Sequence, residues 1–153
     1  MINSGAVPAS RPRTLLGFDF GHARIGVAVG QELTATAQPL AILDAVNQRP
    51  NWSGIDQVIE QWRPELLVVG VPYHADGSKS TVTTSAIRFS RQLRARYSVS
   101  VETIDERLSS REAHTFVATK RTRKIRGTVN RVDAVAAALI LESWLHRYAA
   151  SST

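Results

Sequence analysis

The six consecutive apolar residues Leu66–Val71 constrain the fold of this chain more than any other segment. A run of this length without polar alternation is typical of a strand that is buried on both faces of a sheet. The preceding segment, Trp52–Trp62, has apolar residues at helical spacing, and Arg63-Pro64 is expected to end that helix. A second helix, less regularly spaced, is expected within Val82–Tyr97. Helices on either side of a buried strand predict an α/β fold with a parallel sheet.

Three further strands are predicted before the first helix, at Leu15–Phe20, Ile25–Val29 and Thr34–Leu43. Short turns separate them, so they are expected to form an antiparallel meander, and Pro39 indicates a sheet edge or a bulge. Alternating residues at Val99–Ile104 predict one more strand. The sequence therefore predicts a mixed five-stranded sheet, in which the meander extends the parallel strands and helices flank the whole.

The C-terminal part is expected to be mostly helical. Ser109 and Glu112 have the spacing of a capping box, so a helix is expected to begin there. A basic loop, 120–128, separates it from a final amphipathic helix that runs from Val132 to about Tyr148. We interpret residues 14–148 as a single domain, with a flexible N-terminal tail at 1–13 and a short C-terminal tail at 149–153.

Composition narrows the cellular setting and the partners. The 153 residues are 43% hydrophobic and 21% charged, as in a soluble globular protein, and include no cysteine, which excludes disulfides and cysteine-bound zinc. The first thirteen residues lack the apolar core of a signal peptide, and the apolar run Ala134–Leu141 is too short to cross a bilayer. We expect a cytoplasmic protein, a monomer or weak dimer. Its net charge of +6 favours nucleic acid over a membrane as partner.

Asp19 is the first candidate for chemistry. It lies near the end of the first predicted strand, between large hydrophobic residues, with Gly17 and Gly21 close by. An acid in such a place is costly to bury unless it is paired or bound to metal, and glycines allow a ligand to approach the backbone. The alternative is a carboxylate that only caps the following turn.

Asp105, Glu106 and Asp133 are the other candidate acids. Asp105 and Glu106 follow the last predicted strand, and since neighbours on a strand point to opposite faces, only one of them can easily share a site with Asp19. Each also has a simpler explanation, because acids are stabilised near helix N-termini. Together, carboxylates from separate elements suit Mg²⁺ or Mn²⁺, and two such ions can promote phosphodiester hydrolysis.

Basic and aromatic residues could bind the backbone and bases of nucleic acid. The loop 73–79 offers Tyr73 for stacking and Lys79 for phosphate, and Arg107 could contact phosphate or neutralise the acid that the site does not use. A dense cationic stretch lies shortly before Asp133, although such runs are often merely solvated. This stretch comprises Lys120, Arg121, Arg123, Lys124 and Arg126.

Four blocks in this order resemble the Holliday-junction-resolvase-like family, whose members are also called pre-16S ribosomal RNA nucleases. The resemblance covers the chain from Leu15 to about Leu145. The blocks are Leu16–Gly21 with Arg24–Val29, Val69–Pro72 with Asp76-Gly77, Asp105–Ser109 with Glu112-Ala113, and Val132–Ala137 with Ile140–Ser143. His22 is a departure, since relatives often carry another small or basic residue there.

The resemblance implies a ribonuclease-H-like fold and a metal-dependent endonuclease that matures the 5′ end of pre-16S ribosomal RNA during ribosome biogenesis. It implies that Asp19, Glu106 and Asp133 are the catalytic metal ligands, and it favours Glu106 over Asp105. We expect them to hold a two-ion Mg²⁺ or Mn²⁺ site. We include Arg24 among the residues expected to contact nucleic acid.

Three alternatives stay open at this stage. The chain could be a resolvase that cuts branched DNA, or a non-catalytic RNA-binding or regulatory module in ribosome biogenesis or transcription. A nucleotide-handling protein of the actin and sugar-kinase type is disfavoured, because those proteins need two such domains to enclose ATP.

Overall fold

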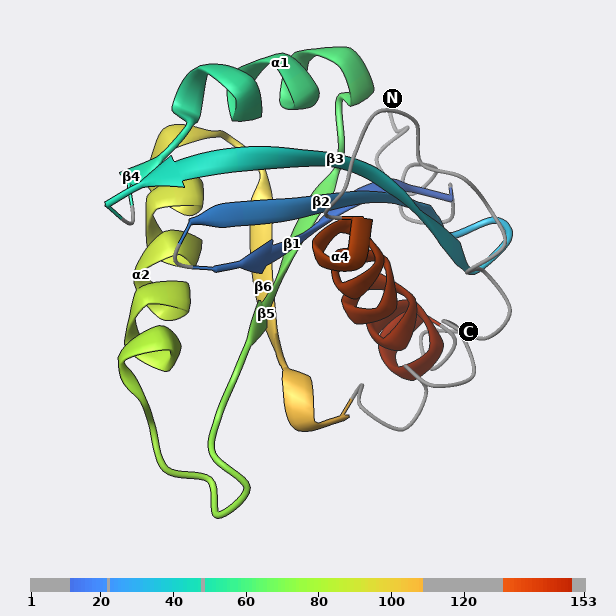
Figure 1. Cartoon of the computed structure of the whole chain (residues 1–153). Coiled ribbons are helices and arrows are strands. Elements are labelled where there is room, and N and C mark those ends of the chain that lie inside the picture. The colour runs from blue at the N-terminus through green and yellow to red at the C-terminus, as the bar shows by residue number, and fades with distance from the viewer. Residues whose placement is uncertain (1–11, 22, 48, 109–130, 150–153) are drawn as a thin grey trace.

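The computed structural model describes residues 12–21, 23–47, 49–108 and 131–149. Four strands come first, and helices and strands alternate after them (Figure 1). In chain order the elements are β1 (Thr14–Phe20), β2 (Arg24–Gln31), β3 (Thr36–Val46), β4 (Arg49–Pro50), α1 (Trp52–Trp62), β5 (Leu66–Val71), α2 (Thr81–Arg96), β6 (Ser100–Asp105), the 3₁₀ turn η2 (Glu106–Leu108), α4 (Arg131–Trp144) and the π-helical turn η3 (Leu145–Ala149). The helix predicted to begin at Ser109 and the basic loop 120–128 lie outside the described residues.

The strands form one mixed sheet in the order β4-β3-β2-β1-β5-β6. β1, β2 and β3 are antiparallel neighbours, whereas β5 pairs parallel to β1 and β6 parallel to β5. This confirms the predicted meander with parallel strands added. The prediction of five strands was wrong by one, because β4 pairs with the end of β3. A strand of two residues is too short to produce a hydrophobic period in the sequence.

β3 begins two residues later than predicted and ends three residues later. Ala35 has a positive φ of 56° in the turn before it, so the extended conformation starts only at Thr36. The register slips near the middle of the strand, where Val27 pairs with Ala41 but Ala28 pairs with Pro39. The extra residue is a β-bulge beside the proline, which cannot donate to the ladder. The bulge inferred from Pro39 is confirmed.

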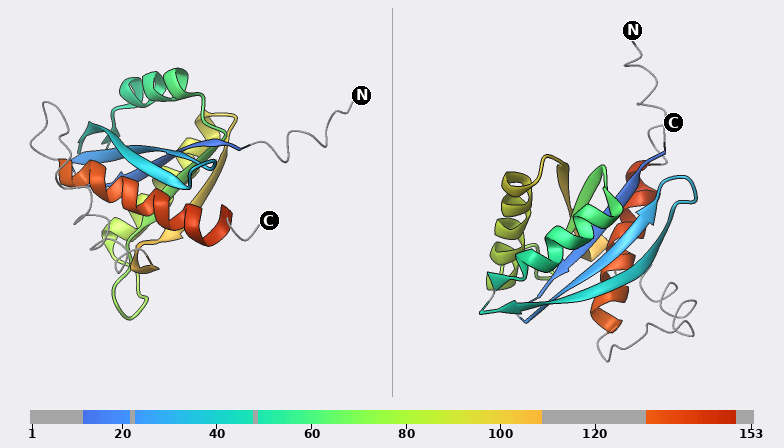
Figure 2. Two further views of the ribbon diagram at one scale, coloured as in Figure 1. Left: turned by 90° about the vertical axis from the view of Figure 1, so that its right-hand side faces the viewer. Right: turned by 90° about the horizontal axis from the view of Figure 1, so that it is seen from above.

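Helices cover the two faces of the sheet unequally. α1 and α2 lie on one face and α4 alone on the other, as the two views in Figure 2 show. Alternate residues of each strand enter the two cores: Leu16 and Phe18 pack towards α1 and α2, and Leu15 packs towards α4. β5 contributes to both cores along its whole length, which explains its unbroken apolar sequence.

Local signals fix the helix ends. Asn51 accepts a hydrogen bond from the Gly54 amide at the start of α1, and Arg63 ends that helix in the left-handed conformation, with a φ of 45°. Ser80 and Thr83 form a reciprocal capping box at the start of α2, which the sequence analysis missed because Thr replaces the usual Glu or Gln. Within the described ranges, no helix is both long enough and apolar enough to cross a membrane.

Candidate active site

Asp19 lies on the face of the sheet that α4 covers. It is the penultimate residue of β1, pairs with Gly70 of β5 and Gly26 of β2, and is partly buried. The face is set by Gly17, two residues earlier, where an added Cβ would lie 2.9 Å from Leu141 Cβ of α4. Since residues two apart on a strand share a face, the Asp19 carboxylate points to the same side.

Glu106 reaches the same face from the end of β6. In that strand Glu102 accepts a hydrogen bond of 3.1 Å from the Trp144 indole of α4, and Ile104 packs in the core under α4. Glu106 continues this alternation in the first position of η2. Its Oε2 lies 2.9 Å from where a Cβ on Gly70 would stand, so the missing side chain of Gly70 makes the space that Glu106 occupies.

The Asp19 and Glu106 carboxyl groups form an interacting pair. Burial, followed by the negative charge of Asp19 and a hydrogen bond with Asp19, together raise the pKa of Glu106 to about 8. Two carboxylates that crowd one site cannot both ionise cheaply, so near neutral pH the pair holds a proton. This pair is the most perturbed acidic site in the described part of the chain.

Asp105 points to the opposite face and is neutralised there. The Arg107 guanidinium donates to Asp105 from Nε at 3.0 Å and from Nη2 at 2.6 Å, and these hydrogen bonds hold the pKa of Asp105 below its usual range. Arg107 therefore neutralises Asp105, the acid that lies away from Asp19, which is one of the two roles expected for it from the sequence. The structure thus separates two neighbouring acids that the sequence alone could not distinguish.

The backbone of Asp133 lies in the first turn of α4, and its side chain is outside the described part of the structure. α4 runs antiparallel to β1: Arg13 lies over the Trp144 ring at the start of the strand, and Gly17 faces Ala137. One helical turn before Ala137 brings the chain to position 133, towards the end of β1 where Asp19 lies. The helix on which Asp133 lies therefore covers the face shared by Asp19 and Glu106.

These acids fit a hard divalent cation. Carboxylate oxygens are the ligands that Mg²⁺ and Mn²⁺ prefer, and a cation between Asp19 and Glu106 would replace the shared proton and remove the repulsion between the two charges. In the described ranges no cluster of three or more potential ligands is present; the described side chains contribute two, Asp19 and Glu106.

The other residues predicted to contact nucleic acid are dispersed around the ends of the strands. Arg24 is exposed at the start of β2, and Lys79 is exposed in the loop between β5 and α2. Tyr73 is partly buried in that loop, with the Arg107 guanidinium 5.5 Å above its ring. Arg107 also donates to the Ala75 carbonyl at 3.4 Å, so it ties the loop to η2. The cationic residues Lys120, Arg121, Arg123, Lys124 and Arg126 lie outside the described residues.

Gly70 is the site residue that the sequence analysis missed. The sequence placed it in an apolar strand and in a block that resembles the family, with no role at the site, yet it separates Asp19 from Ile104 in the sheet and accommodates Glu106. A glycine inside an otherwise β-branched and leucine-rich strand is itself a signal, because it weakens the strand and often marks a close approach.

A sequence model of the RuvX family, described as Holliday junction resolvase, matches residues 13–147. This chain belongs to the RuvX family. A relative from Azotobacter vinelandii is 47% identical over 137 residues, which cover 89% of this chain and 95% of the relative. One from Proteus mirabilis is 45% identical and covers 88% of this chain and 96% of the relative. Both are named "Putative pre-16S rRNA nuclease". The resemblance noted in the sequence is confirmed.

Solved structures of resolvases share the fold. Thermus thermophilus RuvC in complex with a Holliday junction substrate superposes with a TM-score of 0.55 at 16% identity, covering 88% of this RuvX chain and 96% of RuvC. The fowlpox virus Holliday junction resolvase also gives 0.55, at 13% identity, over 87% and 98% of the two chains. At such low identity the likeness concerns the fold, and it confirms the predicted ribonuclease-H-like architecture.

Proposed function

We propose that this RuvX chain is a metal-dependent endonuclease that hydrolyses phosphodiester bonds, with Asp19, Glu106 and Asp133 as metal ligands. The observation that carries the proposal is the interacting pair Asp19 and Glu106, held on one face at the ends of neighbouring strands. Paired carboxylates can hold the metal ions that promote phosphodiester hydrolysis by water, and this reaction needs no nucleophilic side chain. The name shared by the relatives supports the 5′ end of pre-16S ribosomal RNA as substrate.

The residues of this chain have separable tasks in such a reaction. Asp19 and Glu106 would hold the cation in place of their shared proton, and Gly70 leaves the space that Glu106 occupies. When bound, Mg²⁺ or Mn²⁺ polarises a water and stabilises charge on the scissile phosphate. The water oxygen would bond to phosphorus as the water loses a proton, the bond from phosphorus to the leaving oxygen would break, and that oxygen would take up a proton in place of the one released. We assign Arg24, Tyr73, Lys79 and Arg107 the task of contacting the nucleic-acid strand.

Cleavage of an RNA that contains the 5′ precursor segment of 16S ribosomal RNA tests this proposal. The wild-type protein should cut it with Mg²⁺ or Mn²⁺ and not with a chelator. Asp19→Asn and Glu106→Gln should each reduce the rate more than about 100-fold, because removing a ligand costs more than removing a residue that only orients one. Activity that survives both substitutions would show that the site is elsewhere.

Asp105→Asn is the matched control for metal binding. It removes the same charge as Asp19→Asn, one residue from Glu106, but on the opposite face, where Arg107 pairs with it. Calorimetric titration with Mn²⁺ should therefore give nearly wild-type affinity for Asp105→Asn and little binding for Asp19→Asn. The reverse result would assign the site to Asp105.

The family description favours branched DNA as a second substrate. A four-way DNA junction assayed beside the RNA distinguishes the two, since faster metal-dependent cutting of the junction would make the chain a resolvase. Tight, salt-sensitive RNA binding without metal-dependent cleavage of either substrate would instead make it a non-catalytic RNA-binding module.

A further inference from the structure

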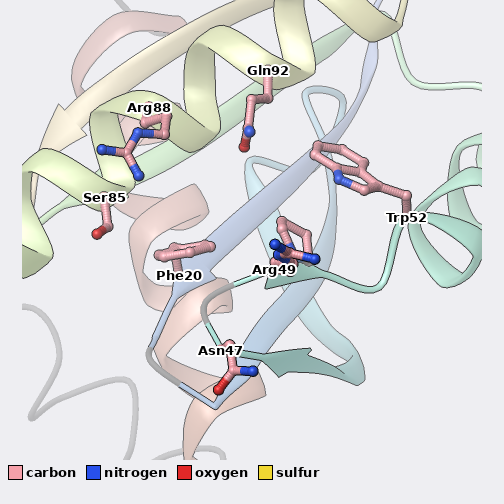
Figure 3. Close-up of a pocket in the computed structure, with 8 residues that line it drawn as sticks. Phe20, Asn47, Arg49, Trp52, Ser85, Arg88 and Gln92 are labelled. Carbon is pink, nitrogen blue, oxygen red and sulfur yellow. The ribbon is translucent and has the colours of Figure 1, made fainter.

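A pocket of about 470 Å³ opens on the face of the sheet opposite Asp19 and Glu106. It lies between the end of β1, the short strand β4, the start of α1 and one side of α2 (Figure 3). Its volume is within the range of small-molecule sites. The residues that line it are Phe20, Asn47, Arg49, Pro50, Trp52, Ser85, Arg88 and Gln92.

The lining is cationic and contains no acid. Arg49 and Arg88 approach from different elements, β4 and α2, and neither forms a salt bridge with a carboxylate in the described part of the chain. Guanidinium groups that line one pocket without a protein counter-ion are suited to phosphate, which they bind through paired N–H donors. Two solvated arginines on one smooth surface would be unremarkable, but here they flank a hollow.

The base of the pocket is aromatic and its rim is polar. Phe20 and Trp52 both pack on Phe89, with ring centroids 5.0 and 5.9 Å from it, so the two rings are held rigidly. Figure 3 shows Ser85 and Gln92 projecting from α2 on the same side of the pocket as Arg88. An apolar floor with amide and hydroxyl groups and two cations at its edge matches the parts of a nucleotide: base, sugar and phosphate.

The pocket and the acid pair meet at one end of β1. Phe20 follows Asp19 directly, and their side chains point to opposite faces of the sheet. The exposed Arg24 lies just beyond the turn that joins β1 to β2, a few residues after Asp19 and Phe20. A nucleic-acid strand that passes this end of the sheet can therefore contact both faces of the sheet.

We propose that this pocket binds a nucleotide, with its phosphate between Arg49 and Arg88 and its base or sugar against Phe20 and Trp52. The nucleotide belongs either to a polynucleotide that extends beyond the acid pair or to a free mononucleotide. The first source rests on the proposed function, because it assumes a nucleic-acid substrate. The binding itself needs neither the metal nor Asp19.

The test compares two double variants of the full chain in EDTA, where no cleavage occurs. Arg49→Gln with Arg88→Gln removes two charges from the pocket, and Arg63→Gln with Arg91→Gln removes two exposed charges elsewhere. Fluorescence anisotropy with labelled single-stranded RNA at several salt concentrations should show about tenfold weaker binding by the pocket variant. In a plot of log association constant against log salt concentration, the slope for the pocket variant should be shallower than that for the control by about 0.7. Equal thermal melting of the variants establishes that both are folded.

A second measurement identifies the source of the nucleotide. Cytidine monophosphate is titrated into ¹⁵N-labelled wild-type protein while the side-chain amides of Asn47 and Gln92 and the Trp52 indole are followed by NMR. Shifts of these signals that vanish in the pocket variant assign a free nucleotide; a loss of RNA binding without such shifts assigns a nucleotide within a strand.

The proposal is overturned if the two double variants bind RNA alike and cytidine monophosphate moves none of the pocket signals. That outcome would leave the nuclease proposal intact. Conversely, a failure of metal-dependent cleavage would leave a positive binding result in EDTA unaffected, so the two proposals fail separately.

Discussion

At the scale of single residues, the site depends on a side chain that is absent. An added Cβ on Gly70 would lie 2.4 Å from Ile140 Cδ1 and 2.9 Å from Glu106 Oε2, both closer than atoms can approach. A side chain at position 70 would therefore push the Glu106 carboxyl group and the Ile140 side chain out of their present positions. Gly17 is equally intolerant on the same face, but its added Cβ would meet α4 at Leu141 and Ala137 and no carboxylate.

Gly70→Ala should displace Glu106 and weaken Mn²⁺ binding measured by calorimetry, while overpacking costs about 1–3 kcal/mol of unfolding free energy. Gly17→Ala is the control: denaturant titration should show a cost of similar size, with Mn²⁺ affinity kept in the folded fraction. Equal Mn²⁺ affinity in the two variants would contradict the role assigned to Gly70.

At the scale of elements, α1 and α2 are joined by one cluster of polar groups. Arg96 near the end of α2 donates to Asp56 of α1 from Nε at 3.0 Å and from Nη2 at 2.8 Å, and the Tyr97 hydroxyl donates to the same carboxylate at 2.5 Å. The hydrogen bonds from Arg96, and then that from Tyr97, lower the pKa of Asp56 from 3.8 to about 2. Arg96 also lies over the Trp52 ring, 5.0 Å from its centroid, so the cluster supports the floor of the pocket.

Asp56→Asn should lower the melting temperature at pH 7 modestly, since the pair is half exposed. Because the pKa of Asp56 is lower in the folded than in the unfolded protein, its ionised carboxylate stabilises the fold above pH 3.8. This contribution disappears as the pH falls through about 2. Melting curves from pH 7 to pH 2 should therefore converge for wild type and variant. A constant difference in melting temperature down to pH 2 would show that the Asp56 charge is not responsible.

At the scale of the whole molecule, segments far apart in the chain form one site. Asp19 comes from β1, Glu106 from the end of β6, and α4, which covers both, begins at Arg131. No single element carries both Asp19 and Glu106, so cation binding is expected to be linked to global folding. In the metal-free protein the two acids repel each other. A bound cation would remove this repulsion and so stabilise the folded state further.

Mg²⁺ should raise the melting temperature of the wild-type protein, since a ligand that binds only the folded state stabilises it, by about 2.7 kcal/mol at a concentration 100 times Kd. Asp19→Asn should abolish this increase. In EDTA the same variant should melt at or above the wild-type temperature, because it no longer crowds two carboxylates at one site. Calorimetric scans with and without Mg²⁺ measure both effects, and a variant that Mg²⁺ still stabilises would exclude Asp19 as a ligand.

The local sequence was sufficient for most of the fold. Backbone chemistry and side-chain periodicity, which act over a few residues, account for three features. These are the end of α1 at Arg63-Pro64, the apolar strand Leu66–Val71 and the bulge at Pro39. β4 could not be predicted in this way, because its two residues become a strand only by pairing with β3. The domain boundaries at 14 and 148 stay a prediction.

The acids were visible in the sequence as Asp19, Asp105, Glu106 and Asp133, but the sequence did not determine which of them meet. The alternation of side chains along a strand shows that Asp105 and Glu106 point to opposite faces of the sheet. Only the packing of α4 shows that Glu106, and not Asp105, lies on the same face as Asp19. The pocket formed by Arg49, Arg88 and the aromatic rings was invisible for the same reason. Proximity between residues distant in the chain is created by the tertiary fold, whereas the sequence encodes directly only what neighbouring residues impose on each other.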